Sequence, residues 1–240
     1  MSALQGTIVN AAAVVLGSLA GLVLPRMSDR ARDAVMQGLG LAILFLGLSM
    51  GLKTQNFILA IISLALGGVI GSLLRLDELL DRAGRRLEAA VKRDGGEGGS
   101  LAEGFVSATL LFCVGAMAVI GAIEDALRGD HTILYTKSLL DGVSAMLLTA
   151  TLGIGVIFSA AALFLYQGAI ALSAKHITSF LSAAELDLAV TEASAVGGIL
   201  VAAIGLGVLN VKKINVVNLL PSIAVTAVLA IVNNRWGFLG

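Results

Sequence analysis

The stretch Gly142 to Ala174, GVSAMLLTATLGIGVIFSAAALFLYQGAIALSA, is the longest part of the chain without a charged residue. It has 33 residues between Asp141 and Lys175. One membrane crossing needs about 20 helical residues, and two crossings with a turn need about 40. We therefore expect a broken helix, with the break between Leu152 and Gly155. The alternative is one long tilted helix that extends into water.

The composition places the chain among membrane proteins. Hydrophobic residues make up 58% of the sequence and charged residues 13%, and the mean hydropathy is +0.97. These values exclude a soluble domain. We expect an all-α, polytopic membrane protein with about seven or eight transmembrane segments. The other uncharged windows of crossing length are Met1–Pro25, Ala34–Gly51, Thr54–Leu74, Gly104–Ile123, Ala193–Val211 and Ile214–Asn234.

The positive charges between the windows predict an orientation. Arg26, Arg30 and Arg32 follow the first window, and six more basic residues follow the third. By the positive-inside rule both loops are cytoplasmic, so the N-terminus lies outside. The first window lacks the basic n-region of a signal peptide, so we expect it to remain as a helix.

Several functional classes find no support in the sequence. The formal net charge is zero, which gives no case for nucleic-acid binding. Cys113 is the single cysteine, and His131 and His176 show no metal-ligand spacing, so we expect no metal site. There is no serine elbow, no phosphate loop and no pair of carboxylates deep in an apolar window. We therefore expect neither an enzyme nor a bound cofactor.

An internal repeat is the second informative feature. Gly6–Leu16, GTIVNAAAVVL, matches Gly155–Leu165, GVIFSAAALFL, at six of eleven positions. Leu46-Gly47-Leu48 likewise parallels Ile204-Gly205-Leu206. These matches predict two three-helix repeats. If Ser138–Leu152 crosses by itself, the chain has eight crossings and the repeats are inverted, as in many secondary transporters. If it extends the next helix, there are seven crossings and the repeats are parallel.

The repeat suggests a division of the chain into four parts. Residues 1–75 form the first repeat unit and residues 154–240 the second. Residues 76–100 are expected to form a cytoplasmic amphipathic helix and a glycine-rich linker. Residues 101–153 are expected to hold a central helix, a polar loop and a short broken helix.

A set of short motifs is spread over nearly the whole chain. These motifs are Gly6 to Asn10, Glu103-Gly104-Phe105, Leu111 to Ala118, Gly129-Asp130-His131, Leu134 to Ser138, Asp141-Gly142, Tyr166-Gln167-Gly168, Ala195 to Gly198, and Asn218 to Pro221. Together they resemble the signature of the YdfK/YqgA-type bacterial inner-membrane proteins. The resemblance implies a bacterial inner-membrane protein from a family of unknown function, and it implies no substrate, cofactor or reaction.

Neutral polar groups inside the apolar windows are candidates for binding a substrate or an ion. A broken helix exposes carbonyl groups at one half-helix end and amide groups at the other, and these ends can hold ions without a charged side chain. The alternative is that the hydroxyl groups bond neighbouring helices or their own backbone. The candidates are Asn10, Ser144, Thr149, Thr151, Gly153, Gly155, Ser159, Tyr166, Gln167 and Asn218.

Titratable residues form a second candidate group, for gating or proton relay. Histidine titrates near neutral pH, and an ionisable residue inside a membrane segment is commonly functional. The alternatives are a hydrophilic hairpin with a capped helix start, a local helical pair of Asp125 with Arg128, and a water-facing Glu192. The candidates are Asp130, His131, Tyr135, Lys137, Asp141 and Glu192.

These features predict a secondary transporter that works by alternating access. It would move a small solute, of which an anion is one candidate, and couple this movement to protons or Na⁺. The competing classes are a channel and a non-transporting membrane scaffold. A channel needs a continuous polar stripe, and the windows show only scattered polar residues. The expected partners are membrane lipid and a small-molecule or ion substrate. Gly67, Gly68 and Gly71 suit close helix packing, so we also expect a homo-oligomer.

Overall fold

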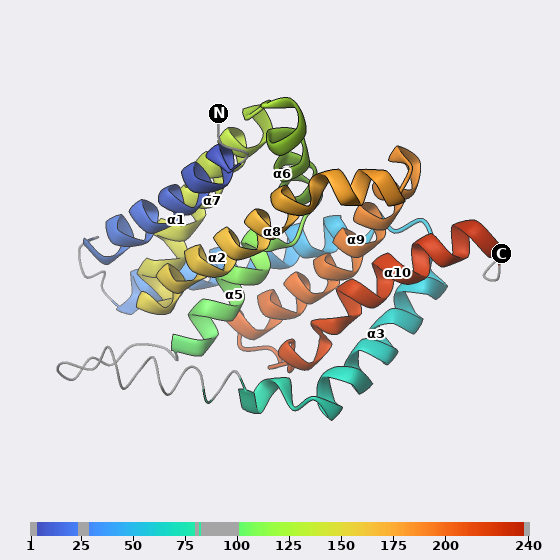
Figure 1. Ribbon diagram of the computed structural model, residues 1–240. Helices are drawn as coiled ribbons and strands as arrows, with labels where there is room; N and C mark the ends of the chain where they lie inside the picture. The colour runs from blue at the N-terminus through green and yellow to red at the C-terminus, as the bar shows by residue number, and fades with distance from the viewer. Residues whose placement is uncertain (1–3, 24–28, 80–81, 83–100, 238–240) are drawn as a thin grey trace. The chain divides into compact units, whose positions relative to one another are not determined.

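Figure 1 shows a computed structural model, which describes residues 4–23, 29–79, 82 and 101–237. These residues are almost wholly helical, and no strand occurs among them. The elements are α1 (Gln5–Val23), α2 (Asp29–Gly51), α3 (Phe57–Leu73), α5 (Leu101–Cys113), α6 (Ala116–Arg128), α7 (Thr132–Leu152), η1 (Ile154–Phe158), α8 (Ser159–Phe180), α9 (Ala183–Val208), η2 (Val217–Leu219) and α10 (Pro221–Trp236).

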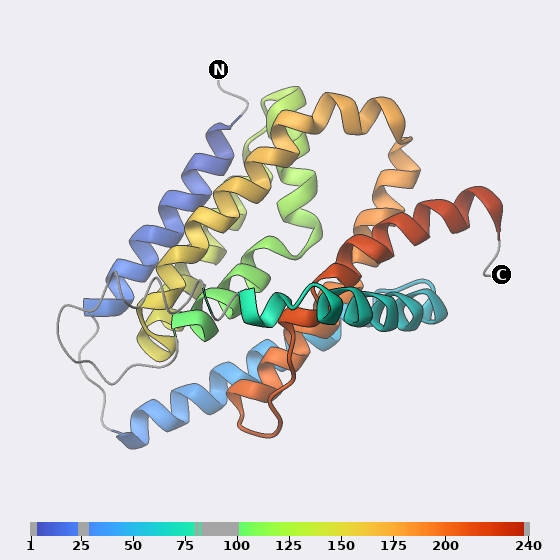
Figure 2. The same ribbon diagram turned by 60° about the horizontal axis from the view of Figure 1, so that its bottom comes forward.

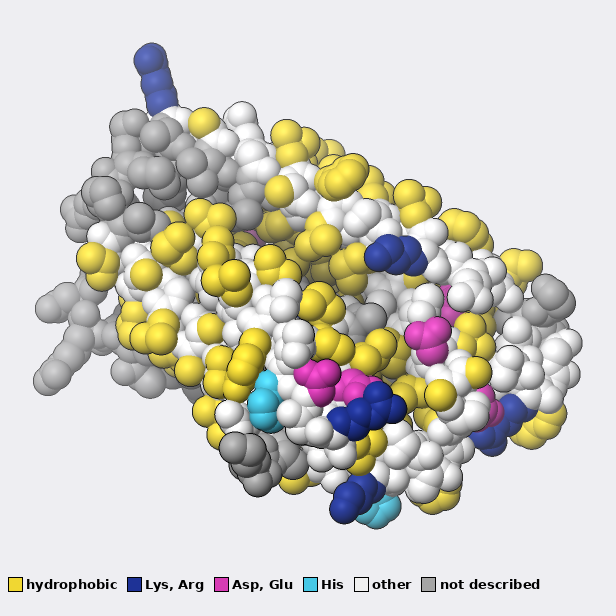
Figure 3. Space-filling view, turned by 90° about the horizontal axis from the view of Figure 1, so that it is seen from above, with side chains coloured by type: hydrophobic (Ala, Val, Ile, Leu, Met, Phe, Trp, Pro, Cys, Tyr) yellow, Lys and Arg dark blue, Asp and Glu magenta, His cyan; other side chains and the backbone are white. Residues whose placement is uncertain are grey.

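Several of the described helices are long and apolar enough to cross a membrane. Four qualify by themselves: α1, η1 with α8, α9, and η2 with α10. The bent pair of α5 and α6 forms a fifth candidate. Large apolar side chains such as Leu16, Phe45 and Leu165 are more than half exposed, and Figure 3 shows apolar side chains spread over one face. This confirms the expected all-α membrane protein.

The long uncharged stretch is broken where the sequence predicts. Helix α7 ends at Leu152, and Gly153 has a φ of 84°, a left-handed value that glycine adopts without steric cost. The short 3₁₀ helix η1 follows, and α8 begins at Ser159. Thus α7 is a helix of its own and does not simply extend α8.

Two helices differ from the expected windows. The window Gly104–Ile123 is not one straight helix, because Gly115 has a φ of 138° and α5 and α6 meet at an angle of 59°. Helix α9 begins at Ala183, ten residues before the predicted Ala193. A capping box of Ser182 and Glu185 starts it there by satisfying free backbone amides of the first turn.

The chain divides into two compact units. The first consists of Met1–Arg32, Leu79–Cys113 and Met117–His176, and the second of Asp33–Glu78, Val114–Ala116 and Ile177–Gly240. The first unit therefore combines α1 with α5 to α8, and the second combines α2 and α3 with α9 and α10. The expected four-part division stays a prediction. Its linker, and all but a few residues of its amphipathic helix, lie outside the described residues.

Within the first unit, α1 and α7 run parallel and very close together (Figures 1 and 2). A Cβ atom on Gly17 would overlap the backbone of Gly142, and one on Gly21 would overlap the carbonyl group of Met146. Contacts thus advance in the same direction along both helices. Gly17 and Gly21 form a small-xxx-small pattern, which allows two membrane helices to approach this closely.

Within the second unit, glycines also bring helices together, here in antiparallel pairs. Gly47 of α2 lies against Ala202 of α9, while Gly205 lies against Leu44. Gly67 of α3 lies against Ser222 at the start of α10, and Gly71 lies against Asn218 of η2. Because Gly67 and Gly71 contact their own chain, they give no support to the expected homo-oligomer, which stays a prediction.

Candidate functional site

Helix α1 carries a buried polar face. Thr7, Asn10 and Ser18 are each 0% exposed, and their spacing places them on one side of the helix. Val14 continues the same buried face. Polar residues in a membrane helix are expensive unless they face protein or water. Thus α1 turns its polar side into the first unit.

A buried ion pair lies on α7. The Lys137 Nζ atom is 2.8 Å from Oδ1 and 2.6 Å from Oδ2 of Asp141, and each residue is only 6% exposed. The two residues are one helical turn apart, which allows them to meet on the same face. A buried charge is stable only when it is paired and hydrogen-bonded. The carboxylate therefore depends on Lys137.

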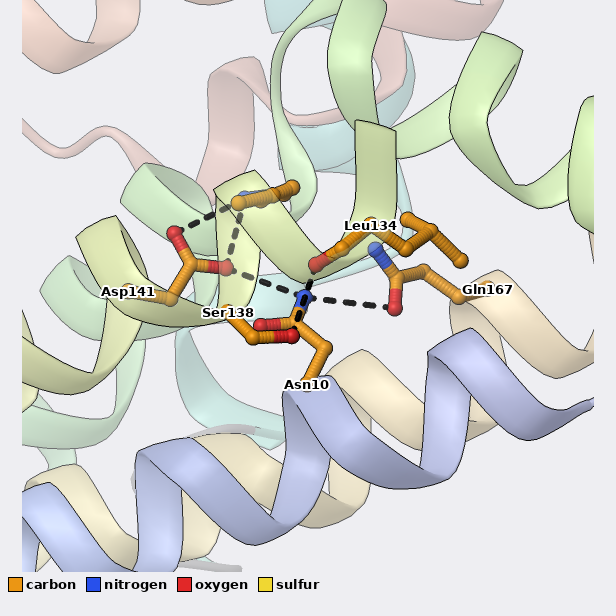
Figure 4. A network of polar contacts seen from close by, with 6 residues as sticks. Asn10, Leu134, Ser138, Asp141 and Gln167 are labelled. Carbon is orange, nitrogen blue, oxygen red and sulfur yellow. Dashed lines mark hydrogen bonds and ion pairs between the residues drawn. The ribbon is translucent and has the colours of Figure 1, made fainter. Parts of the chain in front are cut away.

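Asn10 joins this ion pair to α8. Its Nδ2 atom donates to Oδ2 of Asp141 at 3.1 Å and to Oε1 of Gln167 at 3.3 Å. Gln167 is also 0% exposed. Figure 4 shows the three side chains converging from α1, α7 and α8. We call Asn10, Lys137, Asp141 and Gln167 the polar centre.

Some atoms of the polar centre have no hydrogen-bond partner in the described structure. Oδ1 of Asn10 is an unpaired acceptor and Nε2 of Gln167 is an unpaired donor. The hydroxyl groups of Thr7, Ser18 and Thr149, also in this unit, are unpaired as well. A buried polar atom without a partner costs about 1–3 kcal/mol. The centre can therefore bind an additional group that both donates and accepts hydrogen bonds.

A second group of polar residues lies at the start of α1 and α7. Oδ2 of Asp125 accepts a hydrogen bond from the backbone N–H of Gly6 at 2.9 Å, and Oδ1 contacts Nδ1 of His131. The His131 ring lies 5.5 Å from the Tyr135 ring, centroid to centroid. The Tyr135 hydroxyl accepts from Gln5 at 3.1 Å. We call Gln5, Gly6, Asp125, His131 and Tyr135 the His131 cluster.

Asp130 lies beside this cluster and stabilises the turn that leads into α7. Its Oδ1 atom accepts from the backbone N–H of Thr132 at 3.0 Å, and this hydrogen bond lowers the pKa of the exposed carboxyl group below its usual value. The nearby Arg128 pairs with Glu124 at 3.0 Å. The alternative of a local pair between Asp125 and Arg128 does not hold, because Arg128 pairs with Glu124 and Asp125 is buried.

Glu192 lies in the second unit, on α9. Its Oε2 atom accepts from the Thr54 hydroxyl at 2.5 Å, and its Oε1 atom accepts from the backbone N–H of Gln55 at 2.6 Å. Asn56 then caps α3 by accepting from the backbone N–H of Leu59. Glu192 is 1% exposed, so it does not face water as the alternative required. Instead, it holds the turn that precedes α3.

Asn218 also belongs to the second unit. Its Oδ1 atom accepts from the backbone N–H of Asp77 at 3.1 Å, and Asn215 donates to the Asp77 carboxylate at 3.0 Å. The hydrogen bond that Asp77 accepts from the backbone N–H of Glu78, helped by these amides, lowers the pKa of Asp77. Asn218 thus ties η2 to the residues that follow α3.

The remaining candidates in the broken stretch serve mainly local structure. Thr151 donates to backbone carbonyl groups of its own helix, and Ser159 donates to that of Val156, as the own-backbone alternative proposes. Ser144 is half-buried and Tyr166 is 37% exposed. Gly153 forms the break. Gly155 leaves no room for a Cβ atom against the backbone of Leu101.

Sequence reasoning missed several residues at these sites, among them Thr7, Ser18 and Asp125. Thr7 and Ser18 share the buried face of Asn10, and their spacing along α1 was the signal that could have found them. Asp125 entered only in the alternative of a local helical pair. The signal for Asp125 was its position at the end of an apolar window, six residues before His131.

The two similar stretches that begin at Gly6 and Gly155 also share a pattern of burial. The buried residues of α1 are Gly6, Thr7, Asn10, Val14, Ser18 and Gly21. When they are shifted by the spacing that aligns Gly6 with Gly155, all but Gly21 fall on buried residues of η1 and α8. In this alignment Asn10 corresponds to Ser159, and Ser18 corresponds to Gln167. The two helices run in opposite directions (Figures 1 and 2).

Apolar helices around buried polar groups define a polytopic α-helical membrane protein. The chain belongs to the family described as "Protein of unknown function (DUF554)", whose model matches residues 5–231. It is 35% identical to the "Uncharacterized membrane protein YdfK" of Bacillus subtilis (strain 168), with 97% of this chain and 98% of the relative covered. It is 29% identical to the "Uncharacterized protein YqgA" of Escherichia coli (strain K12), over 96% and 98% of the two chains. No solved structure matches the chain.

Proposed function

We propose that this protein is a secondary transporter, not an enzyme, that moves a small solute coupled to protons or Na⁺. The polar centre is the observation that carries the proposal. Paired charges and unpaired amide atoms lie buried where α1, α7 and α8 meet. Ionisable groups inside a membrane bundle mark ion and substrate pathways in transporters and pumps.

The arrangement of the helices supports inverted repeats. Helix α1 is antiparallel to α8, α2 to α9 and α3 to α10, and each of these pairs lies within one unit. This is the pattern that two three-helix repeats of opposite membrane orientation produce. Transporters with inverted repeats bind their substrate near the middle of the membrane, beside broken helices.

The direction of α7 supports eight crossings. Helix α7 is parallel to α1 and precedes the antiparallel α8, which is the order expected if α7 is a separate crossing among eight. We propose the bacterial inner membrane as the location, and with eight crossings both termini would lie outside. Lys212 and Lys213, between α9 and α10, would then lie on the cytoplasmic side, which agrees with the positive-inside rule.

A channel finds less support from the structure. The polar face of α1 is closed off by α7 and α8, and Asn10 and Ser18 are fully buried. A conducting pore needs polar groups that follow one another to both sides of the membrane. A scaffold protein would need no buried charges, whose desolvation is costly.

A flux assay in proteoliposomes tests the proposal. The purified chain is reconstituted with a pH-sensitive dye inside the vesicles, and gradients of single small solutes, including monocarboxylates, are applied with and without Na⁺. We expect one class of solute to drive proton or Na⁺ movement, and Asp141→Asn to abolish that coupling. The surface double variant Glu124→Gln with Arg128→Gln is the matched control, since it neutralises another ion pair one turn apart. Uncoupled flux would support a channel, and no flux a scaffold.

A further inference from the structure

We infer that Asp141 and Lys137 act together as the coupling pair, with Asp141 binding a proton and Lys137 binding a small monovalent anion in the same transport step. This inference rests on the proposed transport function and specifies its coupling ion and substrate class. It starts from the ion pair in which both carboxylate oxygens of Asp141 lie within 2.8 Å of Nζ.

The charges around the pair are few. Helix α1 and η1, which contact α7, have no titratable side chain. Helix α5 brings Cys113, and α8 brings Tyr166, a thiol and a phenol that are neutral near pH 7. Asp125 of α6 is already bonded to Gly6 and His131. The polar centre therefore contains one positive and one negative charge, both from α7.

Protonation of Asp141 would free Lys137. The proton forms an O–H bond on the carboxyl group, which then no longer carries the charge that holds the ammonium group. The three N–H donors of Lys137 become available to an anion. No other proton donor or acceptor is needed for this step.

The unpaired amide atoms match this exchange. Nδ2 of Asn10 now donates to Oδ2 of Asp141. When that oxygen carries a proton, rotation of the Asn10 amide presents Oδ1, the unpaired acceptor, to the new O–H donor. Nε2 of Gln167 has no partner in the present arrangement and can donate to the anion. Rotation of the Asn10 amide also withdraws Nδ2 from Oε1 of Gln167, so the two amides rearrange together when the proton and the anion bind.

Charge balance explains why the two ions would bind together. The empty pair is neutral, and so is the centre that holds a proton on Asp141 and an anion at Lys137. A proton alone leaves one positive charge and an anion alone leaves one negative charge. An unpaired charge buried inside a membrane helix bundle disfavours each singly loaded form by about 100-fold. The proton and the anion therefore bind cooperatively.

Thermal unfolding of the full chain in lipid, with acetate and chloride as probe anions and the large anion gluconate as the reference, tests this inference without knowledge of the substrate. We expect acetate or chloride to raise Tm of the wild type by about 3–5 °C at ten times its dissociation constant at pH 5.5, with a much smaller rise at pH 8. Asp141→Asn leaves Lys137 unpaired, so its Tm should rise with the anion at both pH values.

Further variants separate this role from a structural one. Lys137→Met and the double variant Lys137→Met with Asp141→Asn should show no anion effect at either pH, and Asp141→Glu should restore the pH-dependent effect. Asp141→Asn can be replaced if it does not fold. The double variant leaves no unpaired charge, so this variant and Asp141→Glu then test whether the anion effect depends on the pair. The double variant Glu124→Gln with Arg128→Gln removes the ion pair between a half-buried glutamate and an exposed arginine, and it should behave as the wild type.

The outcomes distinguish this inference from the transport proposal. An anion effect that is the same at both pH values, or that survives Lys137→Met, overturns the inference. If the pH-linked anion effect is present and proteoliposomes show no flux, the coupling pair stands as a binding site and the transporter proposal fails. If flux is coupled to Na⁺ and unaffected by Lys137→Met, the transporter proposal stands and the coupling pair is wrong.

Discussion

Gly17 of α1 lies directly against the backbone of Gly142 of α7, the residue that follows Asp141. No side chain separates the two helices at this level. The contact is what allows the short side chain of Asn10, two turns earlier on α1, to reach the Asp141 carboxylate at 3.1 Å. The close helix contact and the polar centre are therefore parts of one arrangement.

Gly17→Val should destabilise the protein strongly. The added side chain would overlap the Gly142 backbone, and overpacking of this kind costs about 1–3 kcal/mol. Thermal unfolding of the purified chain measures the effect. Gly38→Ala is the matched control, because that helical glycine has nothing within 4 Å of an added Cβ atom, and alanine there should be neutral or stabilising by about 0.5–1 kcal/mol. Equal losses in both variants would contradict the close contact.

Asn10 and Gln167 should be energetically coupled. We expect the stability losses of Asn10→Ala and Gln167→Ala to be non-additive, with a coupling of about 0.6 kcal/mol, the average for hydrogen bonds between membrane helices. A double-mutant cycle on the free energy of unfolding measures it. The control pair is Asn10→Ala with Tyr166→Phe, because Tyr166 lies on the same helix as Gln167. The stability losses of these two substitutions should be additive.

Glu192→Gln should loosen the turn before α3. The amide replaces one of the two acceptors that Thr54 and Gln55 use, so one donor at this turn loses its partner at a cost of about 1–3 kcal/mol. Thermal unfolding measures the loss. Thr54→Val removes one of these donors and should lower the additional effect of Glu192→Gln. Full additivity of the two substitutions would argue against a shared contact.

Asp130→Asn should change how stability depends on acid pH. The pKa of Asp130 is lowered by the hydrogen bond from the Thr132 backbone N–H, so its charged form stabilises the fold above the usual pKa of 3.8 and this contribution disappears as the pH falls through the lower folded value. We expect the wild type to exceed Asp130→Asn in Tm above about pH 4, with the difference vanishing in stronger acid. A difference that does not vary with pH would show that the charge plays no part.

Cysteine labelling should place alternate loops on opposite sides of the membrane. In a Cys113→Ser background, single cysteines at Arg128 and Phe180 should react with an impermeant reagent added to intact cells. A cysteine at Lys212 should react only after the membrane is opened. This is the order that eight crossings require. Labelling of Lys212 from outside would overturn the eight-crossing model and with it the inverted repeats.

Much of the fold could be predicted from the sequence because the membrane imposes simple length rules. The break between Leu152 and Gly155 followed from a stretch too long for one crossing and too short for two. The bend between α5 and α6 was missed because Gly115 lies inside an apolar window and gives no hydropathy signal. The early start of α9 was missed because charged residues in its first half are typical of a loop. The structure shows that one of them, Glu192, is buried and bonded to the turn before α3.

The candidate site was predictable by residue type and less so by grouping. Asn10 and Gln167 were chosen because an amide in an apolar window needs partners, and the structure brings them together with Lys137 and Asp141. Nothing in the sequence showed that Asn218 and Glu192 belong to the second unit. Which helices pack together depends on contacts between residues more than a hundred positions apart, and hydropathy windows and motif spacing do not reveal such contacts.

Both charges of the polar centre belong to one helix, a single turn apart on α7. A rigid shift of α7 would therefore carry them across the bilayer together and move no net charge. The membrane voltage does work of about 2.3 kcal/mol on each elementary charge per 100 mV, and the contributions from the two opposite charges cancel. Movement of this helix should thus be insensitive to whether the cell is energised or depolarised.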